Sequence, residues 1–303
     1  VMGHEFIGRI INTGSKVNKF EKGDIVSAFP LIPCSIKKNQ NGCIYCNEKK
    51  FNLCEDYDYY GSRRDGSFSE LLDVNEWNLF KVKRETDTKL GSLIEPTAVS
   101  FNIFESLKNR LNNKSNILIL GGGYIGQIIT RILRRKEKNS RIHIIDRNSF
   151  KLKFAKKYSS SQILFSRNDN QNKNIIKKNI SKFDIVIETT GNSLNFLNAL
   201  DFVKKDGLIV YSGNIDKDLL INKGGVSNIL RKQMTIKGIW NSSFKSKQNN
   251  WDQAENFIIK NSGMKNLITH TSDLSNAGNL MGNINLMKKG KKKNNYLKGL
   301  IKI

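Results

Sequence analysis

Four cysteines are gathered in one stretch of the chain, where together they could hold a metal ion. They are Cys34, Cys43, Cys46 and Cys54, and the last three follow the pattern C-x2-C-x7-C. Two thiolates separated by two residues can reach one tetrahedral ion as the chain turns, and four sulfur ligands leave no position for water. The spacing therefore predicts a structural zinc site. Two alternatives stay open, a redox pair at Cys43 and Cys46 or four unlinked thiols.

A glycine-rich loop further along the chain is suited to binding a dinucleotide. It follows the apolar segment NILIL and precedes a segment with helical periodicity. Gly121 permits a tight turn, Gly123 lets the backbone approach a pyrophosphate, and Gly126 allows close packing of helix on strand. The helix then offers free N–H groups to the phosphates at its start, so we expect Tyr124 and Ile125 to contact the cofactor as well.

The acidic residue that ends the next apolar segment bears on the choice of cofactor. Asp146 closes the segment RIHIID, twenty residues after Gly126. A carboxylate there accepts hydrogen bonds from the ribose hydroxyls and repels the additional phosphate of NADP. The sequence thus favours NAD. Arg147, the next residue, keeps NADP open as an alternative.

Alternating strand and helix patterns predict the fold class. We expect strands over FDIVIETTG, GLIVYSG and QMTIKGIW and a helix over SLNFLNALDFVKK. Such alternation is typical of an α/β fold with a doubly wound parallel sheet that binds its cofactor at the carboxyl ends of the strands. We expect His143 to pack inside a strand. The residues that end later strands either contact the cofactor or only end those strands; they are Glu188, Thr189, Thr190, Gly191, Ser212 and Gly213.

Length and composition limit the remaining possibilities. The chain has 303 residues, of which 38% are apolar, enough for two modest domains. It contains neither a long apolar run nor a leader pattern, so we expect a cytoplasmic protein with no membrane partner. The formal net charge of +24 is spread over Lys- and Asn-rich stretches without interleaved aromatic residues. We therefore expect no nucleic-acid partner, although a basic zinc protein that binds nucleic acid stays an alternative.

Taken together, these motifs resemble the zinc-dependent medium-chain alcohol and polyol dehydrogenases over essentially the whole chain. The opening GHEFIG is similar to the G-H-E-x-x-G signature of that family. The segments YDYYGSRRDGSFSE, LIEPTAVSFNIF and ILRKQMTIKGIWNSS most resemble its galactitol-1-phosphate 5-dehydrogenase branch, with sorbitol dehydrogenases next. The resemblance implies a GroES-like β-rich catalytic lobe over residues 1–97, a Rossmann NAD-binding domain over 98–242, and a return to the catalytic lobe over 243–303.

The resemblance also implies a second, catalytic zinc ion. In the family the signature histidine binds this zinc, so His4 is the expected ligand here, and Glu5 and Glu95 are carried into the same site. Zinc there would polarise an alcohol while its hydride passes to the nicotinamide. The family has a further cysteine ligand upstream of the signature. We therefore expect the chain, which begins at Val1, to lack an N-terminal segment and one zinc ligand. The wider gap after Cys34 is a second departure from the family pattern.

The expected reaction is oxidation of a polyol or polyol phosphate, with galactitol 1-phosphate as the leading substrate. Arg63 and Arg64 could bind its phosphate through bidentate hydrogen bonds, although paired arginines are also commonly solvated or bound to carboxylates. We expect a homo-oligomer, a dimer or a tetramer. The alternative is a catalytically silent family member that retains NAD binding. We assign no chemical role to His270.

Overall fold

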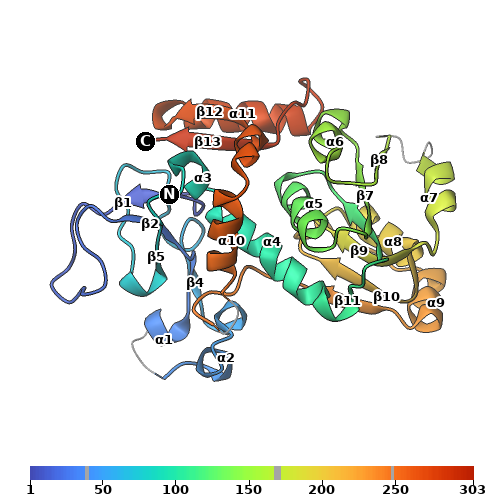
Figure 1. Ribbon diagram of the computed structural model, residues 1–303, viewed down its shortest axis with the longest axis horizontal. Helices are drawn as coiled ribbons and strands as arrows, with labels where there is room; N and C mark the ends of the chain where they lie inside the picture. The colour runs from blue at the N-terminus through green and yellow to red at the C-terminus, as the bar shows by residue number, and fades with distance from the viewer. Residues whose placement is uncertain (38–40, 167–171, 247–248) are drawn as a thin grey trace. The chain divides into compact units, whose positions relative to one another are not determined.

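The computed structural model describes residues 1–37, 41–166, 172–246 and 249–303, and the chain divides into two compact units (Figure 1). The first unit contains Val1–Asn102, Asn241–Leu286 and Lys298–Ile303. The second contains Ile103–Trp240 and Met287–Leu297. The chain passes from the first unit into the second within helix α4 (Ile94–Leu107).

The first unit is the expected β-rich lobe, and its described residues form three small sheets. Strands β1 (Gly8–Arg9), β2 (Ile25–Ala28) and β5 (Leu79–Lys81) form an antiparallel sheet in the order β1-β2-β5. Strand β3 (Leu31–Ile32) pairs with β4 (Asp58–Tyr59), also antiparallel. Strand β12 (Ile268–Asp273) pairs in parallel with β13 (Lys298–Lys302), which lies in the segment YLKGLIKI near the end of the chain.

An aromatic cluster packs around Trp251 in the first unit. Trp251 is fully buried, and its indole N–H donates to Ser242 Oγ at 3.1 Å. Phe29 stacks on Phe244 with 5.0 Å between ring centroids. The described helices of this unit besides α4 are α1 (Cys34–Lys37), α2 (Ile44–Asn47), α3 (Thr88–Gly91), α10 (Asn250–Ile259) and α11 (Ala277–Lys288), with 3-10 turns at Phe51–Leu53, Glu76–Asn78, Ser262–Leu267 and Leu274–Asn276. Helix α11 begins in the first unit, and its last two residues belong to the second.

The second unit contains the predicted doubly wound parallel sheet. Within the described part of this unit, six parallel strands lie in the order β11-β10-β9-β6-β7-β8, so the order reverses between β6 and β9. In such sheets, ligands bind beyond the carboxyl ends of the strands at this reversal. The strands are β6 (Asn116–Leu120), β7 (Arg141–Asp146), β8 (Ser161–Leu164), β9 (Phe183–Glu188), β10 (Val203–Tyr211) and β11 (Thr235–Gly238).

Helices cover both faces of the parallel sheet. Leu118 and Leu120 of β6 belong to one core cluster with Leu200 and Phe202 of α8, so α8 covers that face. Ile117 and the other alternate residues of β6 point to the opposite face and are also fully buried. The helices of this unit are α5 (Tyr124–Lys136), α6 (Ser149–Ala155), α7 (Lys173–Asn179), α8 (Ser193–Phe202) and α9 (Lys223–Lys232), with a 3-10 turn at Lys108–Arg110.

The helix predicted over SLNFLNALDFVKK is shorter than expected, because α8 ends at Phe202 and the last three residues belong to β10. The ammonium group of Lys232 donates to the carbonyl oxygens of Leu200, Asp201 and Val203 at 2.8–2.9 Å. These bonds occupy carbonyl groups that another helical turn would need. The β-branched Val203 pairs instead with Phe183 in the sheet.

Across the described ranges, none of the helices combines the length and the apolar character needed to cross a bilayer.

Candidate functional site

The first unit brings together three candidate metal ligands that lie far apart in the sequence. His4 and Glu5 precede strand β1, whereas Glu95 lies in the first turn of α4. One potential ligand atom from each residue lies within 4.8 Å of the others. An imidazole nitrogen and two carboxylate oxygens form a donor set that suits zinc and leaves a coordination position for substrate.

Close backbone contacts hold the segment that carries His4. The backbone N–H groups of Ser67 and Phe68 donate to the carbonyl oxygens of Gly3 and Met2 at 2.8 and 2.9 Å. A Cβ atom on Gly66 would lie 2.1 Å from the Gly3 carbonyl oxygen, and one on Gly61 would lie 2.4 Å from it. Because only glycine fits at these two positions, the loop around residues 61–68 fixes the segment that precedes the site.

The charges at this cluster favour a bound cation. Glu95 is 3% exposed, and its burial, together with the negative charge of Glu5, raises the pKa of Glu95 to about 8. Burial lowers the pKa of His4, which keeps its imidazole neutral, as metal ligation requires. Lys298 forms an ion pair with Glu5. A divalent cation would offset the remaining negative charge of two carboxylates so close together, so the donor set fits zinc.

Tyr59 of strand β4 lies beside this cluster and was not expected from the sequence. Its ring contacts that of His4 edge to face, with 5.5 Å between centroids. Burial raises the pKa of Tyr59, and the charges of Glu95 and Glu5 raise it further, so the hydroxyl stays protonated. Its oxygen accepts a hydrogen bond from Asn241 Nδ2 at 3.4 Å. Tyr59 and Lys298 carry no local sequence signal, because only folding brings them to the site.

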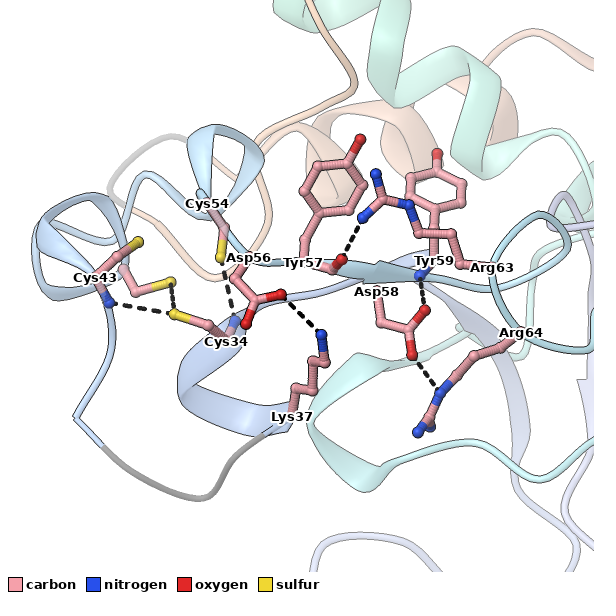
Figure 2. A network of polar contacts seen from close by, with 11 residues as sticks. Cys34, Lys37, Cys43, Cys54, Asp56, Tyr57, Asp58, Tyr59, Arg63 and Arg64 are labelled. Carbon is pink, nitrogen blue, oxygen red and sulfur yellow. Dashed lines mark hydrogen bonds and ion pairs between the residues drawn. The ribbon is translucent and has the colours of Figure 1, made fainter.

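The four cysteines also converge in the first unit (Figure 2), with their sulfur atoms within 4.8 Å of one another. The sulfur atoms of Cys34 and Cys46 are 3.7 Å apart. The backbone N–H groups of Cys34 and Cys43 donate to the sulfurs of Cys54 and Cys34 at 3.1 and 3.2 Å. Hydrogen bonds from N–H groups stabilise thiolates. Four thiolate donors in this arrangement fit a structural zinc ion with no position left for substrate.

The two candidate substrate-binding arginines follow strand β4 and point in different directions (Figure 2). The guanidinium group of Arg63 lies 4.1 Å from the centre of the Tyr57 ring and donates to the Tyr57 carbonyl oxygen at 2.6 Å. Arg64 instead forms an ion pair with Asp58, with 2.5 Å between Nε and Oδ2. The two arginines are thus equivalent candidates in the sequence but have different contacts in the structure.

The glycine-rich loop in the second unit has the geometry that a dinucleotide-binding turn requires. Gly121 has a φ of +109°, and a Cβ atom there would lie 2.6 Å from the Thr190 side chain. A Cβ atom on Gly126 would lie 1.9 Å from the Gly121 carbonyl oxygen. A Cβ atom on Gly123, by contrast, would meet no described atom within 4 Å. Helix α5 starts at Tyr124, buried against the protein, and the partly exposed Ile125 follows.

The two residues expected at the adenosine end lie at the end of strand β7, where Asp146 is the last residue of the strand and Arg147 follows it. Asp146 Oδ2 accepts a hydrogen bond from Gly122 N at 2.7 Å, which places the carboxylate beside the glycine-rich loop. Arg147 is exposed and lines a small cavity with Asn192 and Asn195, among other residues. Both side chains are therefore close to the carboxyl ends of the parallel strands. His143 lies inside β7 as expected, with its ring against Phe183.

The ends of strands β9 and β10 meet next to the same loop. The Glu188 carboxylate is buried and accepts hydrogen bonds from the hydroxyl and the N–H of Thr190. The backbone N–H of Ser212 donates to the Glu188 carbonyl oxygen at 3.0 Å. A Cβ atom on Gly213 would lie 2.1 Å from the backbone nitrogen of Gly191. These residues therefore have structural roles where they lie, whether or not a cofactor contacts them.

Comparison with known proteins agrees with this architecture. The chain matches the family described as "Alcohol dehydrogenase GroES-like domain" over residues 1–84 and the family described as "Zinc-binding dehydrogenase" over residues 125–260. The galactitol 1-phosphate 5-dehydrogenase of Escherichia coli (strain K12) is 29% identical over 273 residues, which cover 89% of this chain and 76% of that protein. The L-threonine 3-dehydrogenase of Alteromonas mediterranea is 25% identical over 278 residues, which cover 89% of this chain and 75% of that protein.

A solved structure extends the similarity to three dimensions. The crystal structure of galactitol-1-phosphate dehydrogenase from Escherichia coli superposes with a TM-score of 0.80 at 26% sequence identity, and the alignment covers 96% of this chain and 82% of that one. The two family matches account for most of the sequence and correspond to the β-rich lobe and the doubly wound sheet. The chain therefore belongs to the zinc-binding medium-chain dehydrogenases, a family of oxidoreductases with a GroES-like domain.

Proposed function

We propose that this protein oxidises a hydroxyl group of a polyol or polyol phosphate to the ketone with zinc and NAD, and that galactitol 1-phosphate is its substrate. The observation that carries the proposal is the convergence of His4, Glu5 and Glu95 in one partly buried cluster. The substrate class rests on the similarity to galactitol 1-phosphate 5-dehydrogenase. In this proposal the first unit is the catalytic lobe and the second is the NAD-binding domain.

We assign a separate role to each cluster of potential ligands. The cluster of His4, Glu5 and Glu95 would hold the catalytic zinc, and the four cysteines would hold a structural zinc. When bound, zinc would supply a Lewis acid for the alcohol oxygen, and the nicotinamide would accept the hydride. Because the cysteine cluster leaves no position for substrate, we assign no chemistry to it.

The protein's own residues keep the catalytic cluster in place. The ring of Tyr59 packs against that of His4 and limits the rotation of the imidazole. The ammonium group of Lys298 orients the Glu5 carboxylate through their ion pair. Glu95 approaches from a different element, the start of α4, so movement of either segment would open the ligand set. Residues that contact metal-binding side chains in this way usually affect both the affinity for the metal and the orientation of those side chains.

The second unit would bind NAD along the carboxyl edge of its sheet. The start of helix α5 would direct its backbone N–H groups to the pyrophosphate beside Gly123, which has no side chain to block the approach. The Asp146 carboxylate would accept the ribose hydroxyl groups, and its negative charge would disfavour NADP. Thr190, Ser212 and Gly213 would lie under the cofactor at the ends of β9 and β10.

A hydride-transfer assay tests this proposal. The purified protein, supplied with zinc, is given galactitol 1-phosphate, sorbitol or L-threonine together with NAD or NADP, and formation of the reduced nicotinamide is followed by absorbance. We expect reduction of NAD by galactitol 1-phosphate and its loss when zinc is chelated. His4→Ala should abolish turnover and keep NAD binding. If the wild-type protein binds zinc and NAD but reduces neither cofactor with any polyol, the protein is a catalytically silent family member and the proposal is wrong.

A further inference from the structure

We propose that Arg63, and not its neighbour Arg64, selects a phosphorylated substrate by binding its phosphate group. The inference deepens the proposed function and rests on it, since it assumes that the substrate is a polyol phosphate oxidised at the cluster of His4, Glu5 and Glu95. In galactitol 1-phosphate the phosphate lies at one end of the carbon chain and the reacting carbon near the other. The phosphate therefore needs a partner away from the metal ligands but on the same side of the protein.

The side chains of strand β4 and of Tyr57, just before it, define that side. Successive side chains in a strand point to opposite faces. Tyr59 contacts the His4 ring, so its face is the one that borders the candidate metal site. Tyr57, two residues earlier, lies on the same face, with 6.3 Å between the centroids of the two tyrosine rings. Figure 2 shows both rings on one side of the strand and Asp58 on the other.

The Arg63 side chain lies on the same side of the strand as the two tyrosine rings. Its guanidinium group lies over the Tyr57 ring and donates to the Tyr57 carbonyl oxygen. In Figure 2 this group lies between the rings of Tyr57 and Tyr59. The backbone N–H of Arg63 also donates to the Tyr59 carbonyl oxygen at 3.0 Å, which anchors the turn after β4. A continuous row of contacts therefore joins His4, Tyr59, Tyr57 and Arg63.

Arg64 lies on the opposite face of the strand, where its charge is already offset. It pairs with Asp58, whose side chain is 15% exposed. Because the Asp58 side chain points away from the two tyrosine rings, the pair faces away from the side that borders His4 (Figure 2). We therefore assign Arg64 a structural role in fixing the turn and no contact with the substrate.

The remaining hydrogen-bonding capacity of Arg63 suits a phosphate. A guanidinium group has five N–H donors in a planar fork, and one of its nitrogens bonds to the Tyr57 carbonyl oxygen. Among the described residues, no carboxylate forms an ion pair with Arg63, and its side chain is exposed. A guanidinium group stacked on an aromatic ring keeps its edge free for bidentate hydrogen bonds to phosphate oxygens. The stacking also fixes its orientation before the substrate binds.

Matched substitutions distinguish the two arginines. For Arg63→Gln, Arg63→Lys and Arg64→Gln, kcat/KM is measured with galactitol 1-phosphate and with galactitol. We expect Arg63→Gln to lower kcat/KM for the phosphorylated substrate by about 10- to 100-fold and to change the value for galactitol little. Arg63→Lys keeps the charge without the planar fork and should give an intermediate loss. Arg64→Gln should affect both substrates alike and so preserve their ratio.

Inorganic phosphate is a second probe of the same contact. It should inhibit the wild-type protein competitively against galactitol 1-phosphate, and Arg63→Gln should weaken this inhibition. The inference is overturned if Arg63→Gln leaves the ratio of the two kcat/KM values unchanged, or if Arg64→Gln reduces that ratio as much. If the wild-type protein oxidises no polyol, the proposed function fails first. Calorimetric binding of galactitol 1-phosphate then decides the role of Arg63, and equal affinity of wild type and Arg63→Gln excludes it.

Discussion

Two glycines of the dinucleotide loop, Gly126 and Gly123, should respond differently to substitution by alanine. Gly126→Ala places a Cβ atom 1.9 Å from the Gly121 carbonyl oxygen. The contact is with backbone, so the loop or the helix must move by about 1 Å, and overpacking of this kind costs about 1–3 kcal/mol. Alanine gains about 1 kcal/mol of helix propensity over glycine, which the clash should outweigh. We therefore expect a net loss of stability for Gly126→Ala.

Gly123→Ala should instead leave the folded protein intact and harm only cofactor binding. Gly123 has a φ of −67° and a ψ of −175°, which alanine adopts without strain, and a Cβ atom there meets no described atom within 4 Å. Reduced flexibility of the unfolded chain favours alanine by about 0.4–1 kcal/mol, but Gly123 is the N-cap of α5, where glycine is preferred to alanine, so we expect little net change in the free energy of unfolding. The new methyl group would occupy the space proposed for the pyrophosphate. We expect the Kd for NAD to rise about tenfold or more, equivalent to about 1.4 kcal/mol.

Thermal unfolding and NAD titration of both variants test this reasoning. Each kcal/mol lost should lower Tm by about 2–4 °C for a domain of this size, so Gly126→Ala should melt below the wild type and Gly123→Ala close to it. The decisive measurement is the affinity of Gly123→Ala for NAD. A wild-type Kd in that variant would show that the pyrophosphate does not pass over Gly123, and the proposed cofactor position would have to be abandoned.

Three further substitutions test the remaining sites. Cys46→Ser should remove one equivalent of zinc, measured by elemental analysis, and lower Tm; unchanged zinc content would rule out the four-cysteine site. Gly66→Ala places a Cβ atom 2.1 Å from the Gly3 carbonyl oxygen and should displace His4. We therefore expect this variant to bind zinc more weakly at His4 and to retain the zinc bound by the cysteines. Equal retention of both zinc ions would contradict this expectation. Burial raises the pKa of Glu188 in the folded protein, despite hydrogen bonds from Thr190 and Gly191. The protonated Glu188 side chain therefore contributes to stability below the ordinary glutamate pKa, and this contribution is lost as pH rises through the raised pKa. Urea unfolding of Glu188→Gln should therefore show a smaller fall in stability over that pH range than the wild type, and parallel pH profiles would refute the assignment.

The sequence alone predicted the parts of the fold that depend on a short, continuous segment. The apolar strands and the glycine spacing around Gly121 and Gly126 predict the doubly wound sheet, because period and turn geometry are local properties of the chain. The cysteine pattern predicts a metal site for the same reason, since Cys43 and Cys46 are only one turn apart. The end of α8 was predicted less well, because the distant Lys232 takes the carbonyl groups at that point.

Only the tertiary structure decided which distant residues act together. At the level of the sequence, only the family resemblance predicted that Glu95 lies beside His4. Nothing in the sequence predicted that Tyr59 or Lys298 lies beside them. Their contacts depend on pairing and packing between segments far apart in the chain. Two adjacent arginines are equivalent as sequence letters, but the contacts of the turn after β4 direct Arg63 and Arg64 to opposite faces. Spacing along the chain thus determined the local motifs, whereas the direction of each side chain was fixed only when the strands paired.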